Sequence, residues 1–415
     1  MRLLLRPLPA TRTRQHRPTP RITGLFLAFL IFGCLFTLSS QAQRGGGGVK
    51  WSKDGKSYYA IENNSLMRYQ LPAFTSVVMV DAAQLTPPGH TTPINIQSFA
   101  FSDDEKKLLI FTNTKKVWRL NTRGDYWLLD LTTHTLKQLG VGRPVSSLMF
   151  AKLSPDGRKA AYTSEHNIYV EDLDPATGGI TALTHDGTTR LINGTFDWVY
   201  EEEFSCRDGF RWSPDSRSIA YWQIDAAKIK NFLMMDNTDS LYSFTVPVEY
   251  PKAGEDPSPC KVGVVSLATG VTTWMNVPGD SRQHYIPRME WAANSAELVL
   301  EQLNRKQNDA KVFICNAATG DAKSIYEETD NAWIDVKHRY SDDPTGWEWM
   351  NGGKEFIWVS EKDGWRHIYR ISRDGTKETL LTKGNYDMIS LKTIDEATGY
   401  IYFMASPDNA TQQYL

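Results

Sequence analysis

The sequence has few of the residues that build metal sites and disulfide frameworks. Its 415 residues include only four cysteines and eight histidines, and no Cys/His spacing among them indicates a metal site. Three of the cysteines, Cys206, Cys260 and Cys315, lie beyond the N-terminal segment. This odd, sparse set is no disulfide framework, although one bridge is possible in an oxidising compartment. We therefore expect no cofactor and no metal ion.

Acidic residues are absent from residues 1–53. In this stretch six arginines precede an apolar run of seventeen residues, 22–38, and the small residues Ser40 and Ala42 follow it. Such an order is typical of a secretory signal. We expect a signal peptide at 1–42, a glycine-rich linker at 43–50, and export to the periplasm or the extracellular space. The alternative is an uncleaved membrane anchor, because seventeen residues are at the short edge of what spans roughly 30 Å of bilayer.

Basic residues do not dominate the chain once the signal is removed. The full sequence has 46 basic and 48 acidic residues. Six of the basic residues precede residue 43, which leaves 40 basic against 48 acidic residues and a net charge of −8. Because binding to nucleic acid depends on a basic surface that displaces counterions, we expect no nucleic-acid partner.

A turn followed by a β-rich run recurs six times after residue 50. The turns are Trp51-Ser52-Lys53-Asp54-Gly55, Phe101-Ser102-Asp103-Asp104, Leu153-Ser154-Pro155-Asp156-Gly157, Trp212-Ser213-Pro214-Asp215-Ser216, Trp291-Ala292-Ala293-Asn294 and Trp349-Met350-Asn351-Gly352-Gly353. Pro fixes φ, Asp forms local hydrogen bonds and Gly accepts positive φ, so each turn favours a hairpin. Units start about 50–80 residues apart, a period typical of four-stranded blades. We predict an all-β fold over 51–415, a β-propeller of seven to eight blades with the last one incomplete. The alternative is a pair of β-sandwiches.

Four of these units carry a tryptophan at the same position of the repeat. They are Trp51, Trp212, Trp291 and Trp349. Because large aromatic side chains dominate the packing between repeats, we expect these four to pack between neighbouring blades rather than to bind a ligand.

The segment Asp197-Trp198-Val199-Tyr200-Glu201-Glu202-Glu203-Phe204 places three consecutive carboxylates after an aromatic-rich turn. Like charges in a row repel one another, so a fold accommodates them on a solvated face or around a cation. Residue type and spacing alone leave both interpretations open.

The same segment closely resembles the signature of the dipeptidyl peptidase IV family. Further family-like stretches extend the resemblance over roughly residues 51–415; they are 166–170, 193–195, 210–215, 246–254, 285–288 and 361–369. The resemblance implies the N-terminal β-propeller of a prolyl oligopeptidase-type serine peptidase, a secreted exopeptidase that releases Xaa-Pro or Xaa-Ala dipeptides.

The resemblance also implies roles for single residues. Glu202 and Glu203 match the two glutamates that bind the free amino terminus of the substrate. Arg119, after Trp118, matches an arginine that binds a substrate carbonyl and pairs with the acidic site; the alternative is a strand residue on the surface. Glu201 is expected to face solvent or to brace the turn.

Catalytic residues of such a peptidase are not found in this chain. No Gly-x-Ser-x-Gly motif, which would carry the serine nucleophile, occurs in the 415 residues. We therefore assign no catalytic residue here, expect the α/β-hydrolase domain to be missing, and interpret the sequence as a fragment of a longer peptidase. Whether the chain is part of an enzyme stays open. The alternative is a lone, non-catalytic propeller that binds peptides or proteins, and a homodimer is possible in either case.

Overall fold

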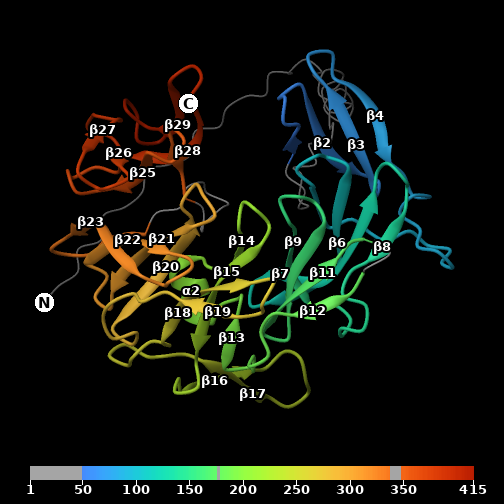
Figure 1. Cartoon of the computed structure of the whole chain (residues 1–415), viewed down its shortest axis with the longest axis horizontal. Helices are drawn as coiled ribbons and strands as arrows, with labels where there is room; N and C mark the ends of the chain where they lie inside the picture. Colours follow the sequence, from blue (N-terminus) through green and yellow to red (C-terminus); the bar gives the residue numbers. More distant parts are fainter. Residues whose placement is uncertain (1–48, 175–177, 337–346) are drawn as a thin grey trace, which may run out of the picture. The chain divides into compact units, whose positions relative to one another are not determined.

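The described residues form an almost entirely β structure with a single short helix (Figure 1). The computed structural model describes residues 49–174, 178–336 and 347–415, which belong to one compact unit, Gly47–Leu415. The predicted signal segment, 1–42, and almost all of the predicted linker, 43–50, lie outside the described residues. No helix within the described ranges is both long enough and apolar enough to cross a membrane.

The strands of the first half form three successive groups of antiparallel strands. The first comprises β1 (Lys50–Trp51), β2 (Ser57–Glu62), β3 (Ser65–Gln70) and β4 (Thr75–Val80); the second β5 (Ser98–Phe101), β6 (Lys107–Val117), β7 (Leu120–Asp130) and β8 (Leu136–Gln138); the third β9 (Leu148–Leu153), β10 (Lys159–Ser164), β11 (Asn167–Asp172) and β12 (Ile180–Ala182). The second and third groups join into one eight-stranded sheet, because β7 also pairs with β9 at Arg123–Met149 and Gly124–Leu148.

The strands of the second half continue the pattern with two insertions. The fourth sheet comprises β13 (Leu191–Asn193), β14 (Phe210–Trp212), β15 (Ser218–Asp225), β18 (Cys260–Ser266) and β19 (Thr272–Trp274); the fifth β20 (His284–Trp291), β21 (Glu297–Asn304), β22 (Asp309–Asn316) and β23 (Ala322–Thr329); the sixth β24 (Trp349–Met350), β25 (Glu355–Ser360), β26 (His367–Ser372) and β27 (Glu378–Leu380); the last β28 (Met388–Asp395) and β29 (Tyr400–Ala405). Helix α2 (Trp198–Phe204) is inserted before β14, and the hairpin of β16 (Asn231–Asp236) and β17 (Phe244–Glu249) is inserted between β15 and β18.

Each predicted repeat begins on one strand of a separate group, namely β1, β5, β9, β14, β20 or β24. This strand is the first of its group except in the five-stranded fourth sheet, where β13 precedes β14. The prediction of an all-β fold built from four-stranded blades is therefore confirmed. A seventh unit contains two strands, in agreement with an incomplete last blade.

Hydrophobic packing follows the same repeat, because each core cluster joins side chains of two successive groups. On β6, Leu108 and Ile110 pack with the first group, whereas Leu109 and Phe111 pack with the third. Alternate residues of a strand point to opposite faces. The second group is therefore buried on both faces, as propeller blades are, and β21 and β25 show the same alternation.

The predicted turns share one hydrogen-bond arrangement. In the third group the Ser154 hydroxyl donates to Asp156 Oδ1 at 2.6 Å and accepts from the Lys159 N–H at 3.0 Å. Units one, two and four repeat both contacts. In the fifth unit Asn294 takes the place of the aspartate and accepts from the Ala296 N–H. An amide is therefore compatible with this position.

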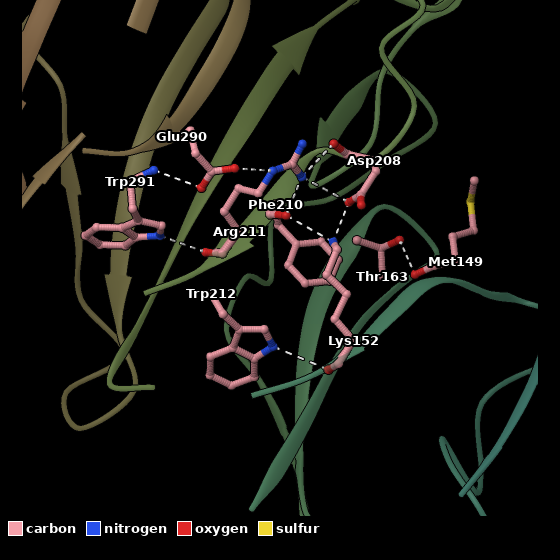
Figure 2. A network of polar contacts seen from close by, with 9 residues as sticks. All are labelled: Met149, Lys152, Thr163, Asp208, Phe210, Arg211, Trp212, Glu290 and Trp291. Carbon is pink, nitrogen blue, oxygen red and sulfur yellow. Dashed lines mark hydrogen bonds and ion pairs between the residues drawn. The ribbon is translucent and has the colours of Figure 1, made fainter. Parts of the chain in front are cut away.

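Polar contacts connect strands β9, β14 and β20 of the third, fourth and fifth groups (Figure 2). The indole N–H of Trp212 donates to the Lys152 carbonyl, and that of Trp291 donates to the Arg211 carbonyl, both at 3.3 Å. Lys152 also pairs with Asp208 and lies 3.3 Å from the centre of the Phe210 ring. Its burial lowers the pKa of Lys152 to about 8. These contacts hold neighbouring blades in register.

Two of the four repeat tryptophans, Trp212 and Trp291, are buried between blades as predicted, and Trp349 packs half-buried at the edge of the cluster between the fifth and sixth groups. The prediction is wrong for Trp51, which is 61% exposed. It belongs to a two-residue strand with no preceding sheet among the described residues, and its ring meets that of Tyr58 edge-on.

Acidification will weaken the turns. Hydrogen bonds from Ser52 and Ser102, followed by those from backbone N–H groups, hold the pKa values of Asp54 and Asp104 below the ordinary value. Because the folded state favours the ionised form of these two carboxyl groups, they stabilise the fold above about pH 3.9, the ordinary pKa of aspartate in an unfolded chain. That contribution is lost as the pH falls through their lower pKa in the folded state. We expect the acid-induced drop in the thermal midpoint, followed by circular dichroism from pH 5 to pH 3, to be smaller in an Asp54→Asn/Asp104→Asn variant. An equal drop in both proteins would contradict this explanation.

Candidate functional site

The acidic segment forms helix α2, which is capped by a buried aspartate. Asp197 Oδ1 accepts from the Tyr200 N–H at 3.1 Å, and its Oδ2 accepts from the Ser258 hydroxyl at 2.6 Å. Burial raises the pKa of this carboxyl group. The helix ends at Ser205, whose φ of 56° lies in the left-handed region. Because seven residues are too few for a stable isolated helix, these caps and tertiary packing must maintain it.

The apolar side of α2 is anchored in the core between the fourth and fifth sheets. Tyr200 is fully buried, and its hydroxyl accepts from the Ile286 N–H at 3.1 Å. Phe204 packs against Tyr285 with ring centres 4.9 Å apart. This anchoring fixes the orientation of the helix and therefore of the three glutamates.

The three glutamates have three different surroundings. Glu201 is only 7% exposed, and its Oε1 accepts from Arg207 Nε at 3.0 Å. Burial, above all, raises the pKa of Glu201. Of the two expectations for Glu201, bracing is therefore correct and exposure to solvent is wrong. Arg207 was not foreseen from the sequence, because nothing in its pattern marks it as the partner of this glutamate.

Glu202 meets the arginine that sequence analysis selected. Arg119 Nη2 lies 2.8 Å from Glu202 Oε2, and the arginine is mainly exposed. Arg119 lies in the tip of the long β6–β7 hairpin, directly after Trp118, whose φ is 52°. The structure thus brings together two residues that are far apart in the sequence and that were predicted to share a site.

Glu203 has a partner that sequence analysis missed. Its Oε1 accepts from Gln307 Nε2 at 2.8 Å. Gln307 belongs to the turn between β21 and β22 in the fifth sheet. The polar run at 304–309 indicates a turn but not its distant partner.

A cavity of about 240 Å³ adjoins these residues. Trp118 and Glu201 contribute to its wall, together with Arg207, His166 and the apolar side chain of Ile192. Burial lowers the pKa of His166. The wall of the cavity thus includes the residue before Arg119 and the first of the three glutamates.

Groups that could hold a metal ion are not found in the described part of the chain: nowhere in it do three His, Cys, Asp or Glu residues gather suitably. Cys206, Cys260 and Cys315 are buried free thiols, so the single bridge left open by the sequence does not form among them. The carboxylate oxygens of Glu202 and Glu203 are acceptors that can form charge-assisted hydrogen bonds with a cation.

Comparison with known proteins shows the kind of domain that this chain forms and the family to which it belongs. The model of the dipeptidyl peptidase IV (DPP IV) N-terminal region matches residues 102–415. The crystal structure of Porphyromonas gingivalis dipeptidyl peptidase 4 superposes with a TM-score of 0.79 and 28% identity, over 89% of this chain and 51% of that one. The fold is thus that of an N-terminal propeller domain. The chain belongs to the dipeptidyl peptidase IV family.

Curated relatives extend over about twice the length of this chain. Probable dipeptidyl peptidase 4 of Emericella nidulans is 25% identical over 88% of this chain and 48% of the relative. Dipeptidyl peptidase 4 of Sus scrofa is 26% identical over 86% and 47%, respectively. Inactive dipeptidyl peptidase 10 of Rattus norvegicus is 26% identical over 86% and 45%. The chain therefore spans about half the length of the curated relatives it matches.

Removal of the helix cap will destabilise the domain. Replacing Asp197 by Ala deletes the acceptor for Tyr200 and leaves the buried Ser258 hydroxyl without it. We expect the free energy of unfolding, measured by urea denaturation, to fall by about 2 kcal/mol. Asp236→Ala, which removes an exposed turn cap at the hairpin tip, is the matched control and should cost less. Equal losses in the two variants would show that α2 does not depend on its cap.

Proposed function

We propose that this chain is the substrate-gating propeller of an exported dipeptidyl peptidase IV-like serine exopeptidase, and that Glu202 and Glu203 bind the amino terminus of the peptide. The observation that supports this function best is the meeting of Arg119 and Glu202 at 2.8 Å, directly beside Glu203. These are the three residues for which the family resemblance implies a role in substrate binding.

The charges of the three glutamates and of their direct partners leave room for the single positive charge of one ammonium group. Arg207 neutralises Glu201 and Arg119 neutralises Glu202, whereas the partner of Glu203 is an uncharged amide. The site therefore keeps one net negative charge. A free α-ammonium group carries one positive charge and three N–H donors, which carboxylate oxygens accept in strong charge-assisted hydrogen bonds.

Binding of the amino terminus at a fixed point also selects the bond that is cleaved. A substrate with its ammonium group on Glu202 and Glu203 presents the bond after its second residue, so the product is a dipeptide. Nucleophile, base and oxyanion hole would come from an α/β-hydrolase domain, for which these 415 residues supply no Gly-x-Ser-x-Gly motif. We expect the isolated chain to bind such peptides and not to hydrolyse them.

Replacing both glutamates will abolish recognition of the free amino terminus. We expect Glu202→Gln/Glu203→Gln to weaken binding of alanyl-proline amide at least about 100-fold, because two charge-assisted hydrogen bonds are lost. Isothermal titration calorimetry on the 415-residue protein measures this loss. Glu327→Gln, which removes another ion-paired glutamate, on β23, is the matched control and should retain wild-type affinity.

The N-acetylated dipeptide amide should bind neither protein, since acetylation removes the positive charge. Tight binding of the acetylated form, or undiminished binding by the double variant, would refute the proposed role of the two glutamates.

The second candidate function is a non-catalytic binding module. The resemblance to a relative whose name describes it as inactive, dipeptidyl peptidase 10 of Rattus norvegicus, favours this candidate. Reading the gene beyond the codon for Leu415 separates the two. An in-frame Gly-x-Ser-x-Gly motif followed by Asp and His supports the peptidase, and a stop codon supports the binding module.

We also propose that residues 1–42 direct export, with membrane anchoring as the alternative.

We further propose that two copies of the chain associate through the β16–β17 hairpin. Leu233 and Met235 are 60% and 65% exposed on one face of the hairpin, and Met234 is 52% exposed on the other. A two-stranded hairpin is marginal in water without further packing. Its free edges allow the self-complementary strand pairing that a two-fold axis requires.

A charged hairpin will therefore not associate. We expect Leu233→Asp/Met235→Asp to convert a dimer into a monomer in light scattering, because the buried interface would then contain unpaired carboxylates. Val271→Asp, at an exposed valine on a different loop, is the control and should stay dimeric. A monomeric wild-type protein would disprove this interface.

A further inference from the structure

We propose that Gln307 is a positioning residue that fixes the Glu203 carboxylate without neutralising it. This inference rests on the proposed function, because it explains how the site keeps one negative charge for a single ammonium group. It adds the turn between β21 and β22 as a third element to a site that the β6–β7 hairpin and helix α2 otherwise form.

The contact itself is a hydrogen bond from a neutral donor. Gln307 Nε2 donates to Glu203 Oε1 at 2.8 Å across 104 residues of sequence. A carboxylate has two oxygens with about four lone-pair sites, so one amide bond leaves room for an ammonium group. An arginine or lysine at 307 would instead cancel the charge that attracts the ligand.

Gln307 can position Glu203 because its own backbone is firmly held. Its φ is 58°, its N–H donates to the Asn304 carbonyl at 2.9 Å, and its carbonyl accepts from the Ile334 N–H at 2.6 Å. The Asn304 side chain accepts from the N–H groups of Asn308 and Asp309. The turn is thus fixed by side-chain and backbone hydrogen bonds on both sides of Gln307.

Arg305, one of the two basic residues on this turn, is directed elsewhere. Arg305 Nη2 donates to the Glu255 carbonyl at 3.1 Å, and its guanidinium group lies 5.8 Å from the centre of the Tyr285 ring. Tyr285 packs against Phe204, the residue that follows Glu203. Arg305 therefore ties the turn to α2 through packing, and the direct bond to Glu203 is left to the uncharged Gln307.

The test compares three substitutions in the 415-residue protein, with alanyl-proline amide as the probe. We expect Gln307→Leu to weaken binding severalfold and Gln307→Lys at least about tenfold, since the lysine also neutralises Glu203. Gln138→Lys, which adds the same charge on the outer strand β8, should bind as the wild type does. The thermal midpoints of all variants should agree within a few degrees, because the contact is exposed.

A double-mutant cycle separates positioning from a merely structural role. In a Glu203→Gln background, titrated to millimolar ligand by NMR, Gln307→Leu should have almost no further effect. The same loss in both backgrounds, or wild-type affinity of Gln307→Lys, would overturn the inference while leaving the proposed function intact. Failure of the wild-type protein to bind any free-amino dipeptide would instead overturn the proposed function, and this inference with it.

Discussion

Burial of the central sheets on both faces is the constraint on which the rest of this structure depends. Leu108 and Leu109, adjacent on β6, belong to two different cores, and the same alternation recurs on β21 and β25. A sheet occupied on both faces has no surface left for a ligand. Recognition must therefore come from turns, hairpin tips and inserted segments, and the candidate site uses all three: the turn of Gln307, the tip at Arg119 and the helix α2. The rigid packing of the blades is what allows such separate segments to meet reproducibly.

Helix α2 shows how a short segment can be rigid without intrinsic stability. Its seven residues are too few to persist alone, yet the Asp197 cap, the buried Tyr200 and the Glu201–Arg207 pair hold it at three points. The first glutamate of the triplet is thereby buried in an ion pair, whereas the next two contact Arg119 and Gln307 at the candidate site. Three chemically identical residues thus have different surroundings because their burial and their partners differ, a distinction that composition does not contain.

The sequence predicts what depends on local chemistry. Ser154-Pro155-Asp156-Gly157 and its equivalents specify a turn through contacts a few residues apart, so the repeat and the blade type could be inferred. Glu202 and Arg119 could be selected only through resemblance to a family, because no local rule links positions 119 and 202. Gln307 was out of reach for the same reason. The exposure of Trp51 was mispredicted because an identical repeat position has different neighbours at the first blade, and the pairing of β7 with β9 has no signature in either strand.

The pairing of β7 with β9 holds the β6–β7 hairpin close to its tip. The hairpin is clamped to the third blade at Arg123–Met149 and Gly124–Leu148, and Arg119 sits on the overhanging end. Three residues of strand, roughly 10 Å, lie between the paired Arg123 and the turn that carries Arg119. The pairing of β7 with β9 therefore limits how far Arg119 can move, in addition to its exposed ion pair with Glu202. The base of the hairpin that carries Arg119 is thus part of the same sheet as β9, so the third blade helps to set where the candidate site lies.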